Sequence, residues 1–146
     1  MKTIVVTAPR RRPVARAIAL LVATLPLAAF AGTPINKLTV ADPAGTVEIS
    51  NTAGTVTVPG WDRNEVEVTG ELGKGTERLD FTRADKITRI KVVLPNRSYN
   101  VEDTDLIVKV PAASLVSVNT VSADIGVQGV RGTQRLQSVS GEMRTE

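Results

Sequence analysis

The chain has 146 residues with 18 Lys or Arg and 15 Asp or Glu, which gives a formal net charge of +3 and room for one domain. The first 31 residues hold 5 basic and no acidic groups, so the remaining 115 carry 13 basic and 15 acidic groups. The basic character thus belongs to the N-terminal segment, which argues against nucleic-acid binding. Cys and His are both absent, which excludes disulfides, thiolate metal sites and the commonest general base.

Residues 1–31 have the pattern of a secretory signal peptide, including a short signal helix. A basic segment from Lys2 to Arg16 precedes an uncharged apolar run over residues 17–25, and Pro26 ends that run. A membrane anchor is the alternative, but a spanning helix needs roughly 20 apolar residues, and this run is shorter. The pattern therefore favours an exported chain with no transmembrane segment after cleavage.

The expected cleavage site is defined by small residues at Ala29 and Ala31, so the mature chain is expected to begin at Gly32. The mature part is then a single domain over residues 32–146. Its expected location is the periplasm or the outer cell surface of a bacterium.

From Leu38 onward, apolar and polar residues alternate with a period of two, and no sustained helical stripe is present. This alternation, together with the abundance of Val, Ile and Thr, predicts half-buried β-strands and an all-β fold. Turn residues separate the runs, for example at residues 51–54, where a turn is expected between the runs 47–49 and 56–58. The clearest alternating runs are 47–49, 56–58, 66–68, 90–92 and 106–110.

Two internal repeats refine the expected architecture. Residues 44–49 recur as 53–58, nine positions later, and residues 118–125 recur as 136–143, eighteen positions later. Short strand repeats of this kind predict a β-solenoid, or β-helix-like stack, in which each rung pairs with the previous one. A β-sandwich with similar hairpins is the alternative. Gly126, Gly129 and Gly132 are expected to mark the corners of the rungs.

The second copy of the longer repeat ends close to Glu146, and no capping rung follows it. An uncovered last strand invites edge-to-edge pairing. We therefore expect either that the domain is incomplete at its C-terminus, as a shortened version of a longer protein, or that its open edge associates with a partner or a second copy.

Several segments resemble the bacterial putative-adhesin family, a domain of unknown function found in exported proteins made of β-strand repeats. The hallmark is Ser-(Ala/Gly)-(Asp/Glu)-apolar, present as Ser122-Ala123-Asp124-Ile125 and Ser140-Gly141-Glu142-Met143. Further matches are 58–70 and 105–111, so the resemblance extends from Gly54 to Met143. It implies an envelope location, a β-helix-like fold and no known catalytic residues. Members usually carry more such repeats, which makes this chain a shortened one.

No catalytic constellation emerges from the sequence. Several serines are available, but no His exists to activate any of them. The hydroxyls around Thr120 and Ser138 are expected instead to form ladders or turn bonds at the corners. We therefore expect a non-enzymatic protein that needs no cofactor and no metal.

Three residues are candidates for surface contacts. Asp103 and Asp105 belong to an acidic segment before a strand, where a solvated turn is favoured and a weak cation site is the alternative. Tyr99 lies in a loop bounded by Pro95 and is the more exposed aromatic candidate for a ligand contact. Trp61 stands at a strand–turn boundary and is expected to plug the end of the sheet rather than stack on a sugar.

Arg89 and Lys91 alternate with Ile90 and Val92 and so share one exposed face, where contact with anionic lipopolysaccharide is conceivable. The overall interpretation is an exported cell-envelope protein that presents a repetitive β surface and binds an unknown envelope or surface ligand. The alternatives are a periplasmic structural or envelope-stress component and the remnant of a carbohydrate-active β-helix enzyme.

Overall fold

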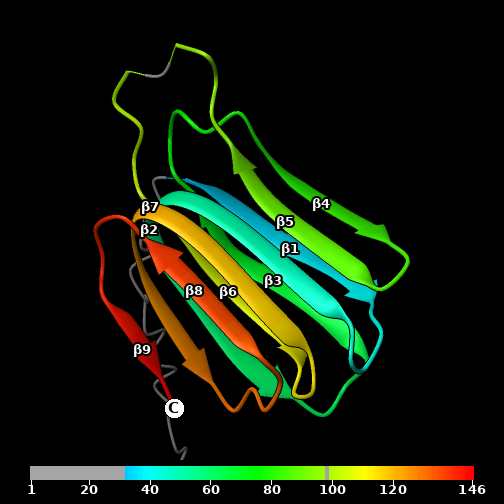
Figure 1. Cartoon of the computed structure of the whole chain (residues 1–146). Coiled ribbons are helices and arrows are strands. Elements are labelled where there is room, and N and C mark those ends of the chain that lie inside the picture. The colour runs from blue at the N-terminus through cyan, green and yellow to red at the C-terminus, as the bar shows by residue number, and fades with distance from the viewer. Residues whose placement is uncertain (1–31, 98) are drawn as a thin grey trace, which may run out of the picture.

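The computed structural model describes residues 32–97 and 99–146, and all of the regular secondary structure within them is β-strand (Figure 1). The all-β prediction is therefore confirmed. The nine strands are β1 (Thr33–Val40), β2 (Thr46–Trp61), β3 (Glu65–Leu72), β4 (Arg78–Ala84), β5 (Ile87–Val93), β6 (Thr104–Pro111), β7 (Leu115–Gln128), β8 (Gln134–Ser138) and β9 (Met143–Thr145).

The long strand β2 links the two layers of the molecule. Its residues 46–50 pair with β5, whereas its residues 54–61 pair with β6, and both pairings are parallel. The strand bends between these halves, where Gly54 has a φ of 110°. The expected turn at residues 51–54 is therefore a bend inside one strand. The nine-residue repeat consequently supplies the two halves of β2 and not two successive rungs.

Strand β7 follows the same path beside β2, so the pairing defines two layers that share these two strands. The first layer contains β4, β5, the first halves of β2 and β7, and β8. The second layer contains β1, β3, β6, the second halves of β2 and β7, and β9. In Figure 1, β8 and β9 lie at one side of the molecule and the β4–β5 hairpin lies at the opposite side.

The inner faces of the two layers meet in one hydrophobic core. Alternation places Val47 and Ile49 of the first layer and Val56 and Val58 of the second layer inside, each at most 1% exposed. Val110, on the strand that the sequence marks as buried, is 0% exposed. Nearly all of the core consists of β-branched residues and Leu, which suit a pleated and fully covered surface.

The eighteen-residue repeat coincides with strand pairing. Val118 pairs with Leu136 between β7 and β8, and Ile125 pairs with Met143 between β7 and β9, both in parallel register. All nine strands nevertheless belong to one sheet, in the order β1-β3-β6-β2-β5-β4 with β7 beside β2, and this sheet curves into a nearly closed, barrel-like shape around the core.

The N-terminal expectations concern residues that are not described, since the signal helix, Ala29 and Ala31 lie outside the described part of the chain. Gly32 is the first described residue. Within residues 32–97 and 99–146, no helix has the length and apolar character needed to cross a bilayer.

Candidate functional site

The structure separates the three residues that the sequence marked as contact candidates. Tyr99 lies in the loop between β5 and β6 and is 85% exposed. Asp103 and Asp105 flank Thr104, which is buried and whose carbonyl oxygen accepts a hydrogen bond from Asn51 Nδ2 at 2.9 Å. Since Thr104 points inward, the two aspartates lie on the outside, and Asp105 lines a cavity.

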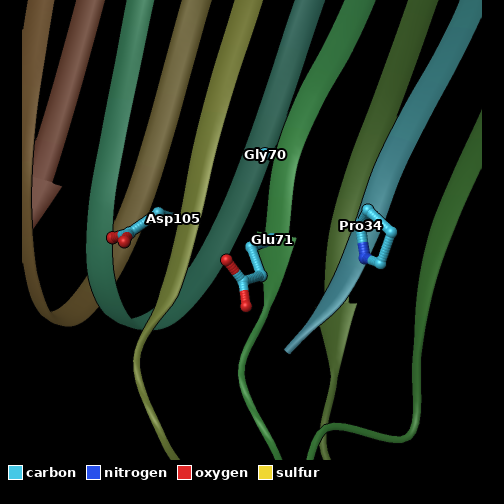
Figure 2. A pocket seen from close by; sticks show the side chains of 4 residues that line it. All are labelled: Pro34, Gly70, Glu71 and Asp105. Atoms are coloured by element: carbon cyan, nitrogen blue, oxygen red, sulfur yellow. The ribbon is translucent and has the colours of Figure 1, made fainter. Parts of the chain in front are cut away.

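The cavity at Asp105 lies on the outer face of the second layer and measures about 320 Å³. Pro34, Gly70, Glu71 and Asp105 line it, from strands β1, β3 and β6 (Figure 2). Glu71 and Asp105 are direct cross-strand partners. In Figure 2 the Asp105 carboxylate points away from Glu71, so the two groups do not converge on one point.

Trp61 closes the end of β2 and is already engaged by neighbouring groups. Its indole Nε1 donates a hydrogen bond to the Glu65 carbonyl oxygen at 2.8 Å. The guanidinium of Arg63 lies 5.1 Å and the Lys109 ammonium 5.4 Å from the ring centroid, within cation–π range. Lys109 also pairs with Glu67 at 2.6 Å. A sugar ring stacking on Trp61 would compete with these cations, which favours the expected role at the sheet end.

The outer face of the first layer carries the basic residues. Arg89 and Lys91 are both exposed there, as their alternation with Ile90 and Val92 predicts. Arg89 Nε is paired with Glu48 at 2.6 Å. The hydrogen bond from Arg78 to Asp80, with the charges of Asp80 and Glu77, raises the pKa of the Arg78 guanidinium. Arg78 and Arg89 are thus each paired with acidic neighbours.

The hydroxyls of the repeat lie at the bend between the layers. Thr120 Oγ1 donates to the Ala123 carbonyl oxygen at 3.3 Å, and Ser138 Oγ donates to the same oxygen at 3.4 Å. Asn51, Thr120 and Ser138 occupy corresponding positions on three neighbouring strands. The expected ladder of turn bonds is confirmed, so these side chains have a structural role.

One hollow in the second layer is not explained by the fold. Gly126 lies inside β7 with its neighbours Ile125 and Val127 buried, so its missing side chain would point outward. A Cβ built on Gly126 would meet no atom within 4 Å, and its φ is not among the positive values. The expectation that Gly126 marks a corner is therefore wrong, whereas Gly129 does have a positive φ of 65°.

The hollow over Gly126, which we call the Gly126 hollow, has a volume of about 290 Å³. Donors and acceptors of several kinds surround it. Its lining is Thr55, Thr57, Asp124, Ile125, Gly126, Gln128, Glu142 and Arg144. Asp124 Oδ1 accepts a hydrogen bond from the Glu142 backbone N–H at 2.8 Å, which fixes that carboxylate at the rim.

The sequence pattern did not reveal this hollow, although it contained a signal. Asp124 and Glu142 are the acids of the two Ser-(Ala/Gly)-(Asp/Glu)-apolar repeats, and Gly126 follows the first repeat by one position. Strand neighbours that are distant in sequence supply the rest, since Thr57 pairs with Gly126 from β2. Within residues 32–97 and 99–146, no group of three or more Asp or Glu side chains is arranged to hold a metal ion.

Comparisons with known proteins find similar solved structures but neither a matching sequence family profile nor a matching curated protein. A putative cell adhesion protein of Clostridium sporogenes is 10% identical, over 77% of this chain and 59% of that chain, with a TM-score of 0.45. A putative adhesin of Parabacteroides merdae is 10% identical over 78% of this chain and 56% of that chain, with a TM-score of 0.40. A putative lipid binding protein of Parabacteroides distasonis is 14% identical over 78% of this chain and 52% of that chain, with a TM-score of 0.42.

The similar structures include proteins that bear the same description as the family that the sequence motifs resemble. This chain spans between 52 and 59% of the length of the three structures named above. Because the TM-scores are below 0.5, the functional assignment of this chain depends on its own residues.

Proposed function

We propose that the chain is an exported, non-enzymatic binding module that contacts a polyhydroxylated ligand, such as a surface glycan, through the Gly126 hollow. The observation that carries this proposal is a strand-interior glycine that neither packing nor φ requires. Glycine weakens a strand, and one that the fold does not need marks a place where another molecule approaches the backbone.

The chemistry of the lining supports a ligand with hydroxyl groups. Carboxylates accept hydrogen bonds, a guanidinium donates them, and Thr hydroxyls and the Gln128 amide do both. Sugar hydroxyls are donors and acceptors at once and can satisfy all of these groups. A volume of about 290 Å³ lies at the small end of ligand pockets, which span roughly 300–1,000 Å³, so the hollow suits one sugar unit.

The orientation of the Glu71 and Asp105 carboxylates favours a binding role over the remnant of an enzyme. A glycosidase needs two carboxyl groups that face one scissile bond across roughly 5–9.5 Å. The facing pair Glu71 and Asp105 diverges in Figure 2, and Glu71 is occupied by a backbone donor from Gly32.

We further infer that β2, β7 and the β8–β9 segment act as successive rungs of a solenoid. Support comes from the in-register parallel pairing at the eighteen-residue spacing. In a longer array, each rung would present its own acid at the rim, as Asp124 and Glu142 do here. Affinity would then come from many weak contacts along the array rather than from one deep pocket.

The test is binding of the purified exported protein to a glycan array that displays neutral, sialylated and lipopolysaccharide-derived oligosaccharides. The Gly126→Thr variant places a branched side chain in the hollow, at a position where the added Cβ meets no atom within 4 Å. The matched control is Ser117→Thr, which adds bulk to the outer face of the first layer on the same strand.

We expect the wild-type chain and Ser117→Thr to bind the same glycans, and Gly126→Thr to lose at least about tenfold in apparent affinity. This loss corresponds to about 1.4 kcal/mol, the size of one or two neutral hydrogen bonds. Equal binding by all three proteins would contradict the hollow as the contact site. Absence of binding by the wild type to every oligosaccharide would contradict the glycan assignment.

A second candidate function, a structural role in the periplasm, is favoured by the edge of the β8–β9 segment. Within the described residues, each of these strands pairs only with β7. The exposed Val139 directly follows β8, and the exposed Met143 is the first residue of β9. A second copy of this chain could pair along this edge. Sedimentation equilibrium tests the idea: a dimer that dissociates on dilution would support it, and a monomer at every concentration would contradict it.

A further inference from the structure

The start of the described chain is held by a carboxylate of β3. The backbone N–H of Gly32 donates a hydrogen bond to Glu71 Oε1. A Cβ at Gly32 would lie 2.1 Å from the Leu72 carbonyl oxygen and 2.7 Å from Glu71 Cγ. The backbone therefore packs so closely at position 32 that only glycine fits there. The nitrogen of Gly32 points at the Glu71 carboxylate.

Among the residues that the structure describes, the carboxylate of Glu71 has no cationic partner. Glu71 lies directly opposite Asp105 on β6, and like charges at facing positions destabilise a sheet. The ion pairs within residues 32–97 and 99–146 involve neither of these two groups. A single positive charge at Gly32 would balance one of these two negative charges.

We propose that Glu71 is the receptor for the mature N-terminus and that cleavage after Ala31 locks β1 onto β3. Hydrolysis of the Ala31–Gly32 peptide bond by a leader peptidase consumes one water molecule. It leaves a carboxylate on Ala31 and an ammonium group on Gly32. This inference rests on the export and cleavage that form part of the proposed function.

The electrostatic gain follows from the change of donor. Before cleavage, Gly32 offers one neutral N–H to Glu71, whereas afterwards it offers three N–H donors and a positive charge. Charge-assisted hydrogen bonds are roughly twice as strong as neutral ones. In the described part of the chain, strand β1 pairs with β3 alone, in antiparallel register over Thr33–Val40, so its attachment there depends on this one neighbour. The ion pair between Gly32 and Glu71 would hold the N-terminal end of β1 against β3.

The test uses the full chain expressed with its leader and purified from the cell envelope. Mass spectrometry first identifies the N-terminal residue. The α-amine is then acetylated near pH 7, where it reacts before the lysines because its ordinary pKa of about 8 lies below theirs, about 10.4. The rate of acetylation and the melting temperature before and after it are measured in wild type, Glu71→Gln and the matched control Glu65→Gln.

We expect Gly32 as the first residue and acetylation at least about fivefold slower in wild type and Glu65→Gln than in Glu71→Gln. Acetylation should lower the melting temperature of wild type by roughly 2–5 °C and that of Glu71→Gln by less than about 1 °C. Equal rates, equal shifts in the two proteins, or a first residue other than Gly32 would overturn the proposal. If the wild type shows these acetylation rates and melting shifts but binds no glycan, the Gly32–Glu71 ion pair stands and only the glycan assignment is contradicted.

Discussion

Strand β7 and the β8–β9 segment carry two copies of the same repeat, yet they differ sharply in burial. Ile125 of β7 is 2% exposed, whereas its repeat partner Met143 of β9 is 52% exposed. Val118 of β7 is 0% exposed, while its partner Leu136 is only partly buried. The difference is one of neighbours, since β7 has strands on both sides and β8 and β9 have β7 alone within the described residues. The burial of a repeat residue is thus determined by the strands that flank it and not by the repeat sequence itself.

The largest expected difference between the two repeat copies comes from an aspartate substituted at the matched positions 118 and 136. Val118→Asp should cost more than about 4 kcal/mol and abolish the cooperative melt, because a carboxylate would enter the core unpaired. Val110→Asp should behave in the same way. Leu136→Asp should cost only about 1–2 kcal/mol, since that side chain retains access to water. Urea denaturation followed by circular dichroism measures both, and similar losses at 118 and 136 would refute the contrast.

Substitutions of two glycines of the repeat region are expected to change the free energy of unfolding by an intermediate amount. A Cβ at Gly132 would lie 2.0 Å from the Ser114 carbonyl oxygen, whereas a Cβ at Gly126 would meet nothing within 4 Å. We expect Gly132→Ala to cost about 2–4 kcal/mol. Gly126→Ala should be neutral or stabilising by up to about 1 kcal/mol, because alanine loses less entropy on folding. Thermal melts of the two variants decide this, and destabilisation by Gly126→Ala would mean that the fold needs that glycine.

The smallest expected effect concerns the hydroxyls at the bend. Thr120→Val should cost about 1 kcal/mol, because it removes a buried hydrogen bond to the Ala123 carbonyl oxygen. Ser138→Ala, on the exposed segment, should cost less than about 0.5 kcal/mol. Chemical denaturation resolves the two values. A larger cost at Ser138 would show that the outer segment is covered in solution.

The sequence predicted the features that depend on local pattern. Alternation located the core positions, such as Val110, and alignment of the two repeat copies placed residue 118 opposite residue 136. The hydroxyl ladder at Thr120 and Ser138 followed from the same alignment. These features repeat over short distances, so neighbouring residues suffice to specify them.

The features that escaped prediction depend on which distant strands become neighbours. The bend at Gly54 lies inside β2 because β5 and β6, which follow much later in the chain, pair with different halves of that strand. The Gly126 hollow needs Thr57 from β2 and Arg144 from β9. The contact between Gly32 and Glu71 joins residues 39 positions apart. Composition and spacing do not identify which distant strands become neighbours.

The central claim, an exported chain that binds outside the cell, is tested most directly by protease treatment of intact cells. Arg97 lies exposed in the loop between β5 and β6 and is a natural site for trypsin. The account predicts that trypsin releases fragments ending at Arg97 from intact cells, and that the N-terminal fragment begins at Gly32. Fragments that appear only after the outer envelope is opened would place the chain in the periplasm and contradict a surface-binding role.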